Sequence, residues 1–244
     1  MTMVELFLSI LISGNLLGGW NDSQSILKKV DAFRVPFEHF LVRTRITTYE
    51  GDRMKETALF DAYINGNDKS LVVQKEGKNK DMKILYVDEK LWVQLPSSRR
   101  PIRITLIQRL MGQASNGDVA MVSYGDDYTA ELLCEEMVNN VLCHKLLLIA
   151  RKKSATYHKI FLYVRKIDYR PVKAEFLLIS GKHFKTAFYD HYMRIGNQMI
   201  LKKMTIFDEV RKDQKTIFEY EKIQEKRLAT KFFNKNYLVH VREL

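Results

Sequence analysis

The sequence predicts a mainly β protein of the α+β class, built on one antiparallel sheet. Many short β-type segments follow one another along the chain and are separated by short polar turns. Strands do not alternate regularly with helices, which argues against a parallel sheet. Several predicted strands are apolar on both faces, so apolar groups must also cover the second face of the sheet.

The composition excludes several classes of protein. The chain has 244 residues, of which 46% are hydrophobic, and this fraction is too high for a disordered chain. No run of about 20 apolar residues is present, which excludes an ordinary polytopic membrane protein. Two cysteines are too few for a disulfide scaffold or a four-cysteine zinc site.

The most apolar stretch, residues 4–17, has the length of a signal-peptide core. We therefore expect residues 1–20 to be a signal peptide or an N-terminal apolar segment, and residues 21–244 to form a single β domain. The signal is atypical, because Glu5 lies within the apolar run and no Lys or Arg precedes it. A misplaced start site that omits a short basic segment would account for the missing charge. The alternative is a buried first helix.

A helix is predicted next, and strands follow it. Asp22 or Ser23 is suited to cap the helix, its apolar residues from Ile26 to Phe33 recur at helical spacing, and Pro36 ends it. The predicted strands cover residues 40–48, 54–64, 70–74, 83–87, 91–95, 129–136, 141–149, 157–165, 172–179, 184–193, 199–207 and 216–220.

The strongest hairpin signal is the Asn-Gly-Asn-Asp sequence at residues 65–68. The middle of the chain is less regular. Residues 99–104 are extended and basic, residues 107–111 predict a short helix, and residues 115–118 and 125–127 predict loops.

One predicted strand shows the two apolar faces clearly. Ile160 and Leu162 share one face, and Phe161 and Tyr163 share the other. The second face would be covered by the curling of the sheet on itself, by the first helix, by residues 106–111 or by a ligand. A curved sheet closed by helices would enclose a hydrophobic cavity.

Catalytic and metal-binding patterns are missing from the sequence. It contains no nucleophile elbow, P-loop or dinucleotide fingerprint. The adjacent Glu135 and Glu136 face opposite sides of a strand, and the six histidines form no helical i, i+4 pair. The Gly-Asp-Asp sequence at residues 125–127 is a better match to an Asp-rich turn than to a polymerase metal loop. We therefore expect no enzyme, no metal and no cofactor.

The two cysteines suggest a disulfide. If residues 137–140 form a four-residue loop, Cys134 and Cys143 lie directly opposite each other across a hairpin. An exported protein would permit a bond between them. The alternative is two free, buried thiols.

The formal net charge is +11, from 40 Lys and Arg against 29 Asp and Glu. Arg99, Arg100 and Arg103 form one basic surface, and further basic groups lie in residues 151–170 and after Lys222. Because no nucleic-acid-binding motif accompanies them, we expect no nucleic-acid partner. An anionic membrane surface fits this charge, and so do simple solvated faces.

Three stretches of the sequence carry a resemblance to a known family. They comprise residues 91–96 with 99–104, residues 108–112 with 115–118 and 124–128, and residues 169–176 with 181–182 and 185–187. With these stretches, the chain resembles the LolA-like outer-membrane lipoprotein-sorting family from about Phe40 to Leu238.

The resemblance implies a LolA/LolB-like lipoprotein-localisation fold. This is a curved antiparallel sheet, or unclosed β-barrel, with helices plugging its open side. It also implies a hydrophobic cavity for acyl chains, with the residues that bind lipid in the lid and in the cavity wall. These are Leu106, Leu110 and Met111 for the lid, and Trp92, Phe161 and Tyr163 for the wall.

The implied function is that of a periplasmic, non-enzymatic carrier or chaperone that moves lipoprotein or lipid acyl chains toward the outer membrane. Similar folds also serve as regulators of the cell envelope that sense lipid or mislocalised lipoprotein, and as helpers of transporters. The expected partners are acyl chains and a membrane surface or envelope transporter. The sequence leaves the oligomeric state open.

Overall fold

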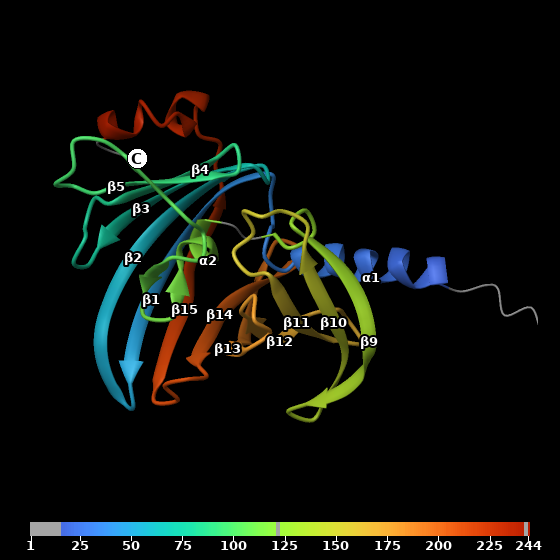
Figure 1. Ribbon diagram of the computed structural model, residues 1–244. Helices are drawn as coiled ribbons and strands as arrows, with labels where there is room; N and C mark the ends of the chain where they lie inside the picture. The colour runs from blue at the N-terminus through green and yellow to red at the C-terminus, as the bar shows by residue number, and fades with distance from the viewer. Residues whose placement is uncertain (1–15, 121–122, 242–243) are drawn as a thin grey trace, which may run out of the picture.

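The computed structural model describes residues 16–120, 123–241 and 244 (Figure 1). The predicted signal segment, residues 1–20, lies mostly outside the described residues. Its last five residues form the start of helix α1, Leu16–Asp31.

Most of the described chain forms one sheet of 13 antiparallel strands. The strands follow the order β6-β5-β4-β3-β2-β1-β15-β14-β13-β12-β11-β10-β9. Their bounds are β1 His39–Glu50, β2 Arg53–Asn65, β3 Lys69–Glu76, β4 Lys83–Val87, β5 Lys90–Gln94, β6 Ile102–Ile104, β9 Tyr128–Val138, β10 Val141–Ala150, β11 Lys159–Arg165, β12 Pro171–Leu177, β13 His183–Ile195, β14 Gln198–Asp208 and β15 Gln214–Glu225.

The sheet curls into a half-barrel and does not close on itself (Figure 1). Strands β6 and β9 are its two edges, and they do not pair with each other. Every strand predicted from the sequence is present, with ends that differ by a few residues. The predicted fold class, a mainly β unclosed barrel with helical elements on its open side, is therefore confirmed.

Helix α1 begins at Leu16, so the predicted cap at Asp22 or Ser23 is wrong. The Ser23 hydroxyl instead accepts a hydrogen bond from the backbone N–H of Leu132 on edge strand β9, at 3.1 Å. The end of the helix before Pro36 is confirmed.

The predicted helix at residues 107–111 is also wrong. Arg109–Met111 form strand β7, which pairs with β8, Ala114–Ser115, through a tight turn at Gly112. Gly112 has φ +53°, and this left-handed conformation favours glycine and ends any helix at this point.

The predicted loop at residues 115–118 is part of a short helix, α2, Asn116–Ala120. The Asp118 carboxylate reaches back to accept a hydrogen bond from the backbone N–H of Ser115, at 2.8 Å. This is the arrangement of a capping box, and it starts a helix in a sequence of turn-forming residues.

The predicted disulfide is not formed, and both cysteines are free thiols. The β9–β10 turn has two residues, Asn139 and Asn140, both with positive φ, where a four-residue loop was expected. This shift pairs Cys134 with Lys145 and Cys143 with Glu136. The cysteines are thus diagonal neighbours, about 7–8 Å apart, which is beyond ordinary disulfide reach.

Two layers cover the two faces of the sheet. The inner face packs against α1 and residues 106–120 in one large apolar core. The outer face of β3–β5 packs against the short C-terminal helices η1, Thr230–Phe233, and η2, Leu238–His240. In Figure 1 these C-terminal helices lie over β4 and β5. The sequence pattern indicated that an apolar layer covers the second face of the sheet, but it did not identify the C-terminal helices as part of that layer.

Candidate lipid-binding interior

The interior of the half-barrel is apolar and is filled by one segment of the chain. We call residues 106–120, which include β7, β8 and α2, the plug. The plug lies within the curve of the sheet (Figure 1). Apolar side chains of the plug and of strands from β1 to β15 form a single buried cluster.

The three predicted lid residues belong to the plug and face this interior. Leu106 and Met111 are buried in the core, and Leu110 is half-buried against it. The structure therefore brings these three together on the inner side of the sheet.

The three predicted wall residues lie on the other face of the sheet. Trp92 packs with the C-terminal helices, and Phe161 and Tyr163 pack in a separate outer cluster. Alternation along the strands explains the error, because the adjacent residues Ile160 and Leu162 are the ones that line the interior. With both faces apolar, the pattern alone does not show which set points inward.

The end of α1 is tied to the loop that precedes β9. The Asp31 carboxylate accepts hydrogen bonds from the Ser123 hydroxyl and from the backbone N–H groups of Tyr124 and Gly125, at 2.7, 2.7 and 2.6 Å. Burial raises the pKa of Asp31, and these three donors oppose that shift. We call this group of contacts the Asp31 latch.

Other polar contacts hold α1 along the same edge. The Gln24 side-chain amide accepts from the backbone N–H of Ala130 and donates to the Tyr128 carbonyl. With the Ser23 contact, these bonds satisfy part of the exposed backbone of edge strand β9. Helix α1 therefore covers both the edge of the sheet and the adjoining interior.

The plug is anchored to the sheet by a second polar cluster. The Tyr157 hydroxyl donates to the Asp118 carboxylate at 2.8 Å, and the Lys185 ammonium group donates to the Ser115 hydroxyl at 2.9 Å. Burial lowers the pKa of Lys185 and raises the pKa of Tyr157 well above its usual value. These groups are charged or polar inside an apolar core, so their mutual contacts fix where the plug lies.

The sheet itself has a split beside the end of α1. Residues 203–207 of β14 pair with β15, whereas residues 198–201 pair with β13 only. On the other side of the split, residues 220 and 222–225 of β15 pair with β1 only. The backbone N–H of Leu201 donates to the Phe33 carbonyl at 2.8 Å, so the chain that leaves α1 crosses the split.

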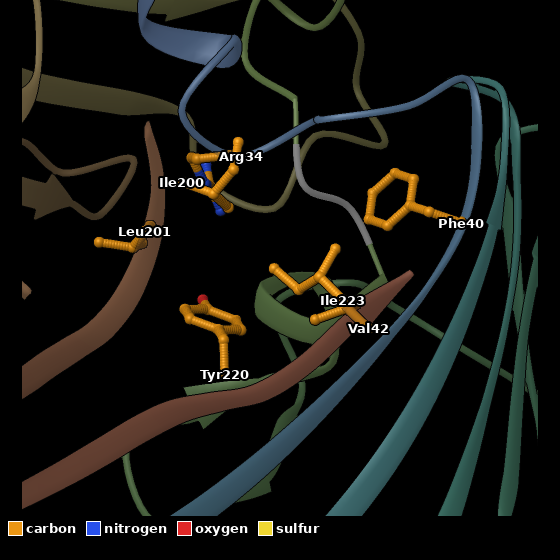
Figure 2. Close-up of a pocket in the computed structure, with 7 residues that line it drawn as sticks. All are labelled: Arg34, Phe40, Val42, Ile200, Leu201, Tyr220 and Ile223. Atoms are coloured by element: carbon orange, nitrogen blue, oxygen red, sulfur yellow. The ribbon is translucent and has the colours of Figure 1, made fainter. Parts of the chain in front are cut away.

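A small pocket occupies this split (Figure 2). Its wall is apolar apart from two side chains, and its residues are Arg34, Phe40, Val42, Ile200, Leu201, Tyr220 and Ile223. Its volume of about 20 Å³ holds about one water molecule. The pocket is thus too small to hold an acyl chain while α1 is in place.

Wider hollows lie around the other end of the plug. Three adjoining hollows meet at Ile107, with volumes of about 530, 450 and 450 Å³. Large apolar side chains are exposed there, among them Ile107, Leu178 and Ile179.

Arg103 of the predicted basic surface and Arg109 line two of these hollows. Arg99, Arg100 and Arg103 are exposed, as is Arg109 on β7. Among the described residues these four arginines have no ion-pair partner. The positive charge here is therefore open to solvent or to an external anion.

The described residues contain no group of three or more His, Cys, Asp or Glu side chains that could hold a metal ion. Sequence reasoning missed Asp31, Arg34 and Tyr220. The one available signal was the placement of two charged residues, Asp31 and Arg34, between the last apolar positions of α1 and Pro36.

Together, the fold and this interior define a class of proteins in which a half-barrel surrounds an apolar core beneath a helical cover. Comparisons with known proteins agree with this description of the fold. A family model described as an uncharacterized protein family matches residues 66–240. None of the curated proteins matches the chain.

Solved structures give close matches. A LolA superfamily protein from Nitrosomonas europaea is 33% identical, with a TM-score of 0.82 over 88% of this chain and 98% of that one. A domain assigned to the outer membrane lipoprotein-sorting proteins, from Vibrio parahaemolyticus, has a TM-score of 0.75 at 18% identity over 90% and 99%. A DUF1329 family protein from Desulfovibrio piger has a TM-score of 0.73 at 18% identity over the same shares of the two chains. The chain belongs to the LolA superfamily.

Proposed function

We propose that the protein is a non-enzymatic carrier that binds the acyl chains of lipoproteins or lipids in its interior, in the space now filled by the plug. One observation carries the proposal. The inner face of the curved sheet forms a single apolar core, and α1 and the plug cover it and are held in place by polar contacts such as those of Asp31 and Asp118. The relation to a lipoprotein-sorting domain supports the same class of cargo.

Simple energetics compare the free energy gained by burying an acyl chain with the cost of opening the Asp31 latch. Moving one CH₂ group from water into an apolar site gains about 0.8 kcal/mol, so a 12-carbon chain gains about 9–10 kcal/mol before entropy costs. A hydrogen bond to a charged group, such as those of the Asp31 latch, contributes about 1.5–3 kcal/mol. An acyl chain can therefore offset the opening of the latch, and no catalytic group is required.

A carrier must also approach a membrane to load or unload. We infer that the unpaired Arg99, Arg100, Arg103 and Arg109 face anionic headgroups, and that the exposed Ile107, which lines hollows together with Arg103 and Arg109, lies beside them at the membrane surface. We place this activity in the periplasm, as the family relation suggests. No helix in the described part of the chain is long and apolar enough to cross a membrane.

Uptake of a fluorescent fatty acid by the purified full chain tests the proposal. We expect saturable binding of one or a few chains per protein, with competition by unlabelled acyl lipid. Fluorescence that stays unchanged at saturating probe, with a folded protein, would rule the carrier out. In a pull-down from envelope extracts, a carrier should retain membrane acceptors, whereas a transmembrane signalling partner would favour the regulatory alternative.

A further inference from the structure

The pocket in the split between β14 and β15 contains a cation without a counterion. The Arg34 side chain has no hydrogen bond or ion pair with any described residue. Its guanidinium carbon lies 4.5 Å from the centre of the Tyr124 ring, a cation–π contact that satisfies none of its N–H donors. An arginine has five such donors, and the pocket wall, which is apolar apart from Arg34 and Tyr220, accepts none of them in this structure.

The nearby Asp31 carboxylate already accepts hydrogen bonds from other groups. Asp31 acts electrostatically on Arg34, but its oxygens accept the three hydrogen bonds of the latch. The positive charge of Arg34 is therefore not neutralised by a direct partner within the site.

A second hydrogen-bond donor in the same pocket, the Tyr220 hydroxyl, supports the same conclusion. The Tyr220 hydroxyl has no hydrogen-bond partner among the described residues. Figure 2 shows it directed toward the side of the pocket where Arg34 lies. Burial raises the pKa of Tyr220 to about 12, so its hydroxyl keeps its proton at neutral pH and can donate it to an acceptor. The remaining wall, from Phe40 and Val42 to Ile223, is hydrocarbon and leads to the interior.

We propose that Arg34 and Tyr220 bind the oxyanion headgroup of a ligand whose acyl chain lies in the interior. This inference rests on the proposed acyl-chain function and narrows its ligand class to anionic amphiphiles, with a carboxylate or a phosphate at the end of the chain. A guanidinium pairs well with either oxyanion, and pairing in an apolar surrounding strengthens the contact.

The ligand has to displace the end of α1. The pocket volume of about 20 Å³ accommodates one water molecule and no chain. The segment that covers it is attached to the sheet by the Phe33–Leu201 hydrogen bond and by an edge-on contact between the Phe33 and Tyr192 rings. Movement of this short segment opens the split and brings Arg34 to the headgroup.

Competition binding on the full chain tests the proposal. A fluorescent acyl probe is displaced by dodecanoate, dodecyl phosphate or dodecanol, three ligands with the same chain and different headgroups. The wild type should bind at least one of the two anions about tenfold or more tightly than the alcohol, and the better anion identifies the headgroup chemistry.

The Arg34→Leu variant should lose this preference and keep its affinity for dodecanol within about twofold. Arg34→Lys should retain part of the preference, and Tyr220→Phe should weaken it. Arg194→Leu, which removes an exposed arginine of β13, serves as the control and should leave the preference unchanged. Thermal unfolding of each variant checks that it is folded.

A failure of the headgroup proposal can be distinguished from a failure of the proposed acyl-chain function. A wild type that binds none of the three ligands contradicts the acyl-chain function itself. A wild type that binds all three equally keeps that function and overturns the role of Arg34. A folded Arg34→Leu protein that loses dodecanol as well, or that retains the anion preference, also overturns it.

Discussion

The Asp31 carboxylate accepts a hydrogen bond of 2.7 Å from the backbone N–H of Tyr124, and this contact joins the end of α1 to the loop that follows the plug. The two covers of the interior are therefore mechanically linked. An event that displaces one of them weakens the hold of the other, which is what release of a cargo requires.

The Asp31 latch sets how readily the interior opens. Asp31→Asn removes the charge and places an amide group against N–H donors, which should cost about 2 kcal/mol of stability. We expect the melting temperature to fall by about 4–8 °C and fatty-acid uptake in stopped-flow fluorescence to become about tenfold faster. Glu219→Gln, on an exposed side chain of β15, is the matched control. If Asp31→Asn destabilises the protein but leaves the rate of fatty-acid uptake unchanged, the latch does not control the opening of the interior.

The turn of the plug hairpin fits tightly against β1 and β15. A Cβ atom at Gly112 would lie 2.4 Å from Thr48 Cγ2 and 2.5 Å from Thr216 Oγ1. Gly112→Ala should therefore displace the plug and destabilise the protein by about 2–3 kcal/mol, measured by urea unfolding. Gly196→Ala has nearly the same φ, +57° against +53°, but no neighbouring atom within 4 Å. Equal destabilisation by the two variants would show that backbone strain alone, and not the fit of the plug, is the cause.

Polar substitutions on the two faces of the sheet should differ in their effect on fatty-acid binding. Leu110 is half-buried on the inner face and Phe161 is half-buried on the outer face. We expect Leu110→Gln to weaken fatty-acid binding several-fold, because it introduces a polar group at the cavity. Phe161→Gln should leave binding unchanged at a similar loss of stability. The reverse order of effects would place the acyl chain on the outer face.

The two thiols should react at different rates. Cys134 is exposed, whereas Cys143 is buried and its pKa is raised by burial. We expect an alkylating reagent to label one thiol per native protein, at Cys134, and two per denatured protein without reductant. Mass spectrometry of the labelled protein distinguishes these cases. Fewer than two labels after denaturation would show that a disulfide forms.

The tight turn between β11 and β12 should contribute a pH-dependent part of the stability. Hydrogen bonds from Arg165 and then Arg170 hold the pKa of Asp168 far below its usual value. A depressed carboxyl pKa stabilises the fold above about pH 4 and ceases to do so as the pH falls below that value. Asp168→Asn should cost about 1–2 kcal/mol at pH 7 and much less near pH 2. Asp52→Asn, in an exposed turn, is the control, and a pH-independent loss for Asp168→Asn would contradict the assignment.

Much of the fold follows from local sequence patterns. Strand periodicity and turn residues such as Asn65-Gly66 place the strands, because hairpins are specified by neighbouring residues. Residues 107–118 were misassigned, since α2 and the β7–β8 hairpin depend on contacts with distant groups such as Tyr157 and Thr216. No local pattern contains those contacts.

The candidate site was predictable only in part. Leu106, Leu110 and Met111 lie on the inner side of the sheet, where the family resemblance placed the lid. The wall residues were assigned to the wrong face, because strands with two apolar faces carry no signal of direction. Arg34 and Tyr220 are separated by most of the chain, and only the split between β14 and β15 brings them to one pocket.

Native mass spectrometry of the full chain after incubation with acyl lipid tests the central claim most directly. The account predicts a folded protein whose mass increases by one or a few bound acyl lipids, with less bound by Leu110→Gln and no change for Phe161→Gln. A folded protein that shows only its own mass after exposure to acyl lipids would contradict a lipid-binding interior.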